Sequence, residues 1–280
     1  MVRIITDSAA DFEPQELQQM NITCIPLTVI MGDREYQENV NLTKPQFFQL
    51  LSELEGAPKT SQASPQILME LFEDAKRAGD EAVYITLSSA LSGTYQSAVM
   101  VRDDVDCENC YVVDSQNATG GQRLLVEYAV HLRDKGKSAR EIVAAVEQIR
   151  QRIVLYACID TLEYLYRGGR INQTVYKLGT LARVKPIIRV TQDGRIEVPA
   201  KAMGMRKGMD FMCTRLDQQK PDPDFPVYIM YTPERVNGEQ LLQQVRKMGI
   251  DVPDDCLVSV GAAIGSHIGP NGCGIVYVEE

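Results

Sequence analysis

Residues 82–99 read AVYITLSSALSGTYQSAV, a short apolar run followed at once by hydroxyls, a glycine and a helical pattern. The β-rich letters of Ala82 to Leu87 predict a strand, and Gly93 to Val101 predicts the helix after it. A strand joined directly to a helix is the repeating unit of α/β folds with a parallel sheet. The hydroxyls between them therefore lie at the carboxyl end of a strand, where such sheets bind ligands.

The same alternation continues on both sides of this stretch. Further strands are predicted at Arg3 to Thr6, Ile22 to Ile30, Tyr111 to Val113 and Ile153 to Ile159. Further helices are predicted at Pro45 to Leu54, Pro65 to Ala78, Gly121 to Asp134 and Ala139 to Arg152. Together they predict an N-terminal α/β domain over residues 1–157, with a mainly parallel sheet flanked by helices.

The later part of the chain has a different character. Gln192-Asp193-Gly194 lies between the β-rich runs Val184 to Val190 and Arg195 to Pro199, and Asp-Gly in this setting predicts a hairpin. Further elements are predicted at Met205 to Gln218 and Glu234 to Met248, as helices, and at Val227 to Tyr231, Leu257 to Val260 and Gly274 to Val278, as strands. They predict a second, smaller α/β domain with a mixed sheet, residues 158–280. Because no flexible linker separates the two, we expect a ligand between them.

Charge and hydropathy restrict the classes of partner. The formal net charge of −9 disfavours nucleic acid and anionic lipid surfaces. The start MVRIITDS lacks the basic and apolar regions of a secretion signal, and Cys256 to Val278, although free of charged side chains, is broken by glycines and Pro270. We therefore expect two strands around a loop there, no transmembrane segment, and a cytoplasmic location.

The seven cysteines also fit a reducing compartment, because their number is odd and they are scattered along the chain. Cys107-Glu-Asn-Cys110 precedes a strand instead of opening a helix, the wrong context for a thioredoxin-type pair. Free thiols are the favoured interpretation, with no metal or redox role. No cluster of histidines is present that could hold a catalytic metal.

Two segments predict a site for an anion. Lys59 to Pro65 places Thr60 and Ser61 just before a helix start, where free backbone N–H groups favour negative charge. Leu87 to Gln96 does the same with Ser92 and Gly93. The alternative is purely local, since serines before helices also act as N-caps.

A glycine-rich segment and a double-glycine turn are further candidates. Gly265 to Gly272 is too rich in glycine for a regular helix or strand, so we expect a loop whose His267 contacts a ligand. In Tyr164 to Ile171 the paired glycines predict a sharp turn that exposes Arg167 and Arg170 for phosphate or partner recognition. Helix C-capping by Gly168 explains the glycines equally well.

The common enzyme signatures are absent. Gly136-Lys137-Ser138 joins two predicted helices and has no phosphate-loop context, and the chain has neither a G-x-S-x-G elbow nor a G-x-G-x-x-G fingerprint. Nucleotide-dependent, hydrolytic and redox folds are thereby disfavoured.

Taken in order, several motifs resemble the DegV family over the whole chain. They are Ile5-Thr6-Asp7-Ser8 with Asp11, Lys59-Thr60-Ser61-Gln62, Ser88 to Ala98, Asp114-Ser115, Tyr166 to Ile171, Lys185-Pro186 and Gly265 to Gly269. The resemblance implies a two-domain α/β protein that holds one long-chain fatty acid, such as palmitate, stearate or oleate. It implies no cofactor and no catalytic residue of its own.

The resemblance also implies roles for individual residues. Thr60 and Ser92, with Ser61, Gly93 and His267 beside them, are expected around the fatty-acid carboxylate. Arg167 and Arg170 are expected to dock a separate ATP-dependent fatty acid kinase, which converts the carboxylate to an acyl phosphate, a phospholipid precursor.

One departure and two alternatives accompany this interpretation. Met203 stands where family members often carry arginine, which puts the network behind the carboxylate in doubt. A serine-dependent acyl hydrolase, with Ser92 or Ser61 as nucleophile and His267 as base, is one alternative. A carrier of another small anion, which requires a short polar pocket, is the other.

Overall fold

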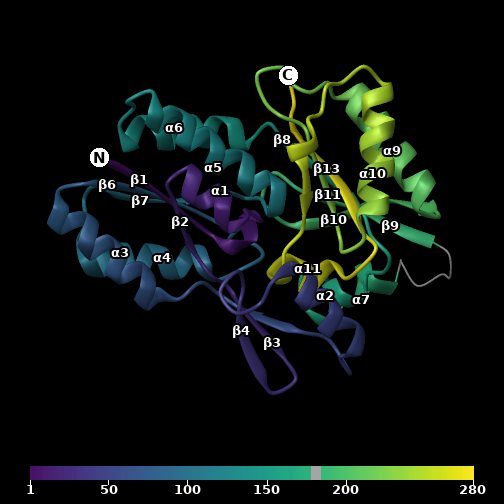
Figure 1. Cartoon of the computed structure of the whole chain (residues 1–280), viewed down its shortest axis with the longest axis horizontal. Helices are drawn as coiled ribbons and strands as arrows, with labels where there is room; N and C mark the ends of the chain where they lie inside the picture. The colour runs from purple at the N-terminus through teal and green to yellow at the C-terminus, as the bar shows by residue number, and fades with distance from the viewer. Residues whose placement is uncertain (178–183) are drawn as a thin grey trace.

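The computed structural model describes residues 1–177 and 184–280, and these form an α/β fold around three sheets (Figure 1). The first sheet is entirely parallel, as predicted. Its strand order is β2 (Ile22–Ile25), β1 (Val2–Asp7), β6 (Glu81–Thr86) and β7 (Cys110–Asp114). Four helices cover it: α3 (Pro65–Ala78), α4 (Thr94–Val105), α5 (Thr119–Asp134) and α6 (Ala139–Arg150).

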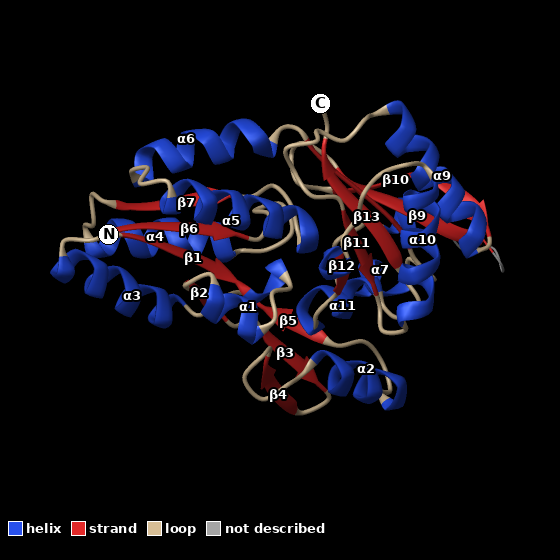
Figure 2. Ribbon diagram, turned by 45° about the horizontal axis from the view of Figure 1, so that its top comes forward, coloured by secondary structure: helices blue, strands red, loops and turns tan. Residues whose placement is uncertain are grey.

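Side-chain alternation along these strands explains the layers. Ile5 and Tyr84 pack against α3 and α4, whereas their neighbours Ile4, Val83 and Ile85 pack against α5 and α6. A strand buried on both faces must be apolar at nearly every position, which is the pattern of β1 and β6. Figure 2 shows α5 and α6 on one side of this sheet and α3 on the other.

The second large sheet is mixed. Its strand order is β10 (Ile196–Met203), β9 (Val184–Val190), β8 (Ile153–Cys158), β13 (Cys273–Val278), β11 (Tyr228–Tyr231) and β12 (Leu257–Ser259). Only β11 and β12 pair in parallel. The predicted hairpin at Asp193-Gly194 is confirmed as the β9–β10 connection, where Gly194 adopts φ +79°. The boundary at residue 157 falls within β8, and the division into two domains stays a prediction.

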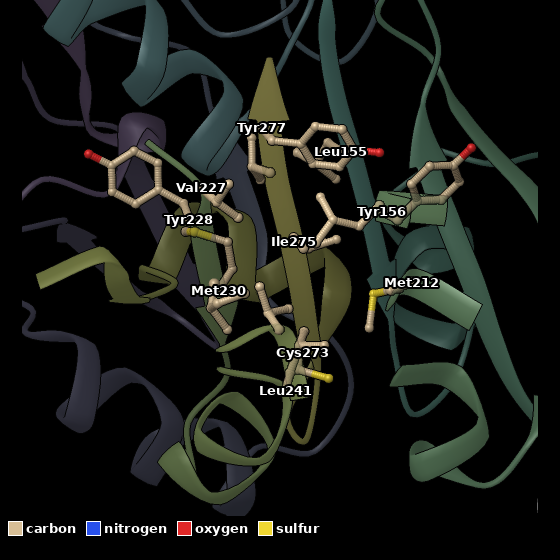
Figure 3. Close-up of a cluster of buried hydrophobic side chains, with 14 of the residues drawn as sticks. Leu155, Tyr156, Met212, Val227, Tyr228, Met230, Leu241, Cys273, Ile275 and Tyr277 are labelled. Atoms are coloured by element: carbon tan, nitrogen blue, oxygen red, sulfur yellow. The ribbon is translucent and has the colours of Figure 1, made fainter. Parts of the chain in front are cut away.

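Two helices, α9 (Met205–Gln218) and α10 (Arg235–Lys247), pack on one face of the mixed sheet. Figure 3 shows the apolar core on this sheet, with Ile275 of β13 at its centre and Met212 and Leu241 reaching it from the helices. Ile275 has no exposed surface. This core is built almost entirely from apolar side chains.

A small third sheet was not predicted. It consists of β4 (Arg34–Gln37), β3 (Thr28–Met31) and β5 (Lys59–Ser61), all antiparallel. The single strand predicted over Ile22 to Ile30 is wrong, because Pro26 separates β2 from β3 and the two belong to different sheets. The remaining short elements are η1 (Ser8–Ala10), α1 (Pro14–Gln19), α2 (Lys44–Glu53), α7 (Glu163–Arg167), α8 (Gln173–Lys177) and η2 (Asp254–Cys256).

The glycine-rich segment near the C-terminus is the main local correction. The predicted loop is instead helix α11 (Ala262–Ile268), which ends at Gly269 with φ +71°. Tertiary contacts override its weak helix propensity, because Gly265 lies against the Phe47 ring with no room for a β-carbon. The segment predicted as two strands around a loop therefore consists of two strands, β12 and β13, around helix α11.

The cysteine prediction is also partly wrong. Cys107 and Cys110 form a disulfide, while Cys24, Cys158, Cys213, Cys256 and Cys273 are free thiols. The two paired residues flank a tight turn, so their proximity in space follows from the chain path. Across residues 1–177 and 184–280, no helix is long and apolar enough to cross a membrane.

Candidate ligand-binding site

A cavity of about 270 Å³ lies where the loops of the parallel sheet meet α11, α7 and the β9–β10 hairpin. Its polar or glycine lining comprises Thr60, Ser61, Gln62, Ser92, Gly93, Arg170 and His267. Its apolar lining comprises Leu27, Leu87, Leu91, Ala118, Leu165, Ile196, Ala263, Ile264 and Ile268. All five residues predicted around a carboxylate thus line one cavity, although they are far apart in the sequence.

The elements explain this convergence. Thr60 is carried by β5, which follows α2 and pairs with β3. Ser92 lies in the connection from β6 to α4, at the carboxyl end of the parallel sheet. His267 comes from the last turn of α11, and Figure 2 shows this helix beside both β5 and the mixed sheet.

The central polar contact joins Thr60 and His267. Thr60 Oγ1 and His267 Nε2 are 2.8 Å apart, and the histidine is only 9% exposed. Burial lowers the pKa of His267 to about 3, and the positive charge of Arg170 acts in the same direction. The imidazole is therefore uncharged at neutral pH.

Packing around the ring favours one tautomer. The ring lies against Gly168, where a β-carbon would fall 2.2 Å from His267 Nδ1. Within residues 1–177 and 184–280, this buried Nδ1 has no hydrogen-bond partner. A buried N–H without an acceptor is rarer than a bare acceptor, so we assign the proton to Nε2, which then donates to Thr60. The hydroxyl proton of Thr60 is left to donate to a ligand.

Ser92 lines the cavity and bonds the first residue of α4. Its Oγ accepts a hydrogen bond from Thr94 N at 3.2 Å and lies 2.9 Å from Thr94 Oγ1. The N-cap position of α4 is Gly93. Ser92 is therefore not the N-cap, although its hydroxyl accepts from the first backbone N–H of α4, and it lines the cavity.

The double-glycine turn divides its two arginines. Arg167 is exposed and pairs with Glu163 on the surface. Arg170 is partly buried in the cavity wall, where its Nε donates to the carbonyl of Leu91 at 3.0 Å and its Nη1 to that of Gly168. Only Arg167 has the accessibility expected of a docking residue.

Exposure differs between the two ends of the cavity. Ser61, Gln62 and Gly93 are exposed, whereas Leu27 and Ala263 are buried. Part of the polar lining is therefore accessible from the surface, and part of the apolar lining lies in the interior. Met203 is 61% exposed and is not among the lining residues, so the departure noted there does not touch the cavity.

The geometry does not form a hydrolase triad. His267 Nε2 contacts Thr60, and no carboxylate of the described residues bonds its Nδ1. Asp7 is engaged by Leu87 N and Gln122, and Asp114 by backbone N–H groups. A histidine with so low a pKa is also a weak general base.

A larger open groove, about 820 Å³, lies between α2 and the ends of β11 and β12. Phe48, Tyr164 and Tyr231 are among its lining residues, and no predicted site residue lines it. In the part of the chain that the structure describes, no group of histidine, cysteine, aspartate or glutamate could hold a metal ion.

The sequence did not predict the apolar wall or the placing of Arg170. Ala263, Ile264 and Ile268 line the cavity because α11 is helical, and the sequence was interpreted as a loop there. Arg170 could have been suspected from its position beside a turn, but no local signal separates it from Arg167.

The fold and the site define an α/β protein in which a small cavity, apolar within and hydroxyl-rich at its mouth, lies between two large sheets. The family model described as "uncharacterised protein, DegV family" matches residues 1–280. The chain belongs to the DegV family.

Individual relatives agree over the full length. A DegV domain-containing protein of Caldanaerobacter subterraneus subsp. tengcongensis is 33% identical over 283 residues, covering 100% of this chain and 99% of the relative. One from Clostridium perfringens is 32% identical over 284 residues, covering 99% and 97%.

Solved structures are similar as well. A DegV family protein from Thermus thermophilus, described by its fatty acid binding, superimposes with a TM-score of 0.89 at 28% identity, covering 100% of this chain and 99% of that one. A DegV lipid-binding protein from Thermotoga maritima gives a TM-score of 0.85 at 25% identity, covering 99% and 98%.

Proposed function

We propose that this chain binds one long-chain fatty acid and presents its carboxylate to a separate ATP-dependent fatty acid kinase in the cytoplasm. In this proposal Thr60 and Ser92 bond the carboxylate, with Ser61, Gly93 and His267 beside it, and the acyl chain enters the apolar part of the cavity. The protein itself contributes no catalytic residue and needs no cofactor. The similarity to fatty-acid-binding and lipid-binding DegV proteins supports this proposal.

The observation that carries it is the hydrogen bond between Thr60 and His267 at the mouth of an apolar cavity. A neutral imidazole that donates to Thr60 directs the threonine hydroxyl toward a ligand oxygen. Arg170, in the wall beside His267, supplies a positive charge that compensates the carboxylate. Without such partners, removing a carboxylate from water is strongly unfavourable.

The acyl chain provides most of the driving force. A sixteen-carbon acid has about fourteen methylenes, and at about 0.8 kcal/mol each their full burial contributes on the order of 11 kcal/mol. The polar groups mainly fix which end of the ligand lies at the mouth. Because Ser61 and Gly93 are exposed there, a bound carboxylate lies within reach of a partner enzyme.

The two arginines of the turn have different roles in this proposal. Arg167 remains the docking residue, because it is exposed on the turn next to the cavity. Arg170 is better assigned to the cavity wall than to a partner surface.

The test is mass spectrometry of lipid retained after purification from a bacterium without detergent. The wild type is expected to carry close to one fatty acid such as palmitate, stearate or oleate per chain. Thr60→Val with Ser92→Ala is expected to lose it while remaining folded. An empty wild-type protein, or a double variant with unchanged lipid content, contradicts the proposal. A short polar anion in place of a lipid supports the small-anion carrier instead.

A further inference from the structure

Helix α11 determines the shape of the candidate cavity. Four of its seven residues line the cavity: Ala263, Ile264, His267 and Ile268. The helix has only seven residues, about two turns. A shift at its N-terminus is therefore transmitted directly to His267 in its last turn. What holds the N-terminus therefore also determines whether His267 reaches Thr60.

Two buried carboxyl groups hold this N-terminus. Asp11 Oδ1 accepts a hydrogen bond from Gly261 N at 2.8 Å, and Glu38 Oε1 accepts one from Ala263 N at 3.2 Å. Asp11 is 1% exposed and Glu38 is 2% exposed. They come from η1 and from the end of β4, so the N-terminal part of the chain fixes a helix near the C-terminus.

Gly261 has a specific part in this arrangement. A β-carbon at Gly261 would lie 2.2 Å from Glu38 Oε1 and 2.9 Å from Asp11 Oδ1. Its φ of −83° is open to any residue, so the backbone conformation does not require glycine. The close approach of the two carboxyl groups requires it.

Stability alone does not account for two carboxyl groups at this place. Both are desolvated and near each other, and Glu38 Oε2 has no hydrogen-bond partner within residues 1–177 and 184–280. Lys44, a buried cation whose charge acts on both groups, donates to the backbone carbonyls of Asp11 and Ser259 and to Glu13. Burying a carboxyl group costs free energy that an apolar residue of the same size does not, so a role in geometry fits these two residues better than a role in stability.

We propose that Asp11 and Glu38 are positioning residues for fatty-acid binding, which fix α11 so that His267 meets Thr60 at the mouth of the cavity. This inference rests on the proposed function for its affinity readout. Its second readout, the state of the His267 ring, does not depend on any ligand.

The experiment compares Glu38→Met, which removes the acceptor at similar length, with Glu38→Gln, which keeps an acceptor oxygen for Ala263 N. Glu35→Met is the matched control, because Glu35 is exposed on β4, the strand that Glu38 follows. Affinity for oleic acid is measured after delipidation, and the two histidines are followed by nitrogen-15 spectra through a pH titration. His131 lies exposed on α5 and reports any general disturbance.

We expect Glu38→Met to weaken oleic acid binding about tenfold, the effect of losing one buried hydrogen bond. We also expect it to raise the pKa of His267 from about 3 toward its usual 6.5, without changing the His131 resonances. Glu38→Gln should restore both properties, and Glu35→Met should change neither.

Gly261→Ala tests the same link from the other side and serves if Glu38→Met does not fold. Its β-carbon displaces the carboxyl groups, so the same change in the His267 titration is expected. A folded Glu38→Met or Gly261→Ala protein with the wild-type His267 titration and affinity overturns the inference. Should the wild type bind no fatty acid, the proposed function fails, while the His267 titration still decides the positioning role.

Discussion

Two buried regions of this molecule differ in composition, one apolar and one containing carboxyl groups. The core on the mixed sheet, around Ile275 and Met212, is apolar, and its packing requires no compensation of charge (Figure 3). The layer between the sheets contains the buried carboxyl groups of Asp7, Asp11 and Glu38. The first arrangement maximises burial of apolar area, whereas the second accepts a desolvation penalty in return for directed hydrogen bonds.

Stability and ligand geometry depend on different regions of this molecule. None of the buried residues of the apolar core lines the cavity, and the core meets the cavity wall only through Ile264 and Ile268 among the described residues. The polar layer adjoins the cavity through α11. Changes in the first region should therefore lower stability and leave ligand geometry intact, and changes in the second should do the reverse.

The largest expected effect is in the apolar core. Ile275→Ala should lower the free energy of unfolding by about 3 to 4 kcal/mol, because the side chain is fully buried and leaves a cavity. Urea unfolding measures it. Val236→Ala, at an exposed position, should stay within about 0.5 kcal/mol. A loss of fatty-acid retention in folded Ile275→Ala protein would contradict the separation of stability from ligand binding.

The next effect is in the cavity. Thr60→Val with Ser92→Ala should weaken oleic acid binding by roughly 3 kcal/mol, since two hydrogen bonds to a charged group are lost. The free energy of unfolding of the ligand-free protein should fall by only about 1 kcal/mol, because both hydroxyls are partly exposed and the main loss is the hydrogen bond between His267 and Thr60. Calorimetric titration measures the affinity for oleic acid, and urea unfolding of the same samples measures the free energy of unfolding. Equal losses in both would contradict the division of roles.

A smaller effect concerns pH. Burial, with the charge of Asp11 next in importance, raises the pKa of Glu38 from 4.5 to about 7. The folded protein thus keeps a proton that the unfolded chain releases, so the Glu38 contribution to stability falls as pH rises from about 4.5 to 7. Asp7 and Asp11, each with a pKa raised to about 6 mainly by burial, act in the same direction, and Lys44 opposes the shift at Asp11 and Glu38.

Glu38→Gln should remove this part of the pH dependence. Relative to the wild type, the variant should gain on the order of 2 kcal/mol between about pH 4.5 and pH 8. Urea unfolding of both proteins at the two pH values measures the difference. Parallel pH profiles would show that Glu38 does not titrate in this window.

The smallest effect on stability is expected at the surface turn. Arg167→Ala removes an exposed ion pair with Glu163 and should change the free energy of unfolding by less than about 0.5 kcal/mol. If the proposed function holds, it should leave retained lipid unchanged and slow phosphorylation of the bound fatty acid by the proposed kinase partner. Arg170→Ala is the contrasting variant, expected to weaken lipid retention because Arg170 is in the cavity wall. Normal turnover with Arg167→Ala would reject this docking site.

The sequence predicted what depends on local pattern. The parallel sheet, the Asp193-Gly194 hairpin and helix α9 follow from strand alternation, turn chemistry and helical periodicity. Helix α11 could not be predicted, because its support comes from Asp11 and Glu38 more than 200 residues away. The β3–β5 pairing was missed for the same reason, since a three-residue strand has no pattern of its own.

The sequence grouped the residues that line the cavity but did not predict their geometry, and their role in binding stays a prediction. Motif positions placed Thr60, Ser92 and His267 in one group, and the structure brings them to one cavity. The direct Thr60 to His267 contact and the inward placing of Arg170 depend on how three separate elements pack.

The central claim, that a fatty-acid carboxylate is held at the Thr60 and His267 end of the cavity, is tested most directly by carbon-13 spectroscopy of palmitic acid labelled at its carboxyl carbon. We expect one bound resonance that does not titrate between about pH 5 and pH 8, because hydrogen bonds and Arg170 hold the carboxylate ionised. That resonance should shift in Thr60→Val. A bound resonance that titrates like the free acid and ignores Thr60→Val would contradict it.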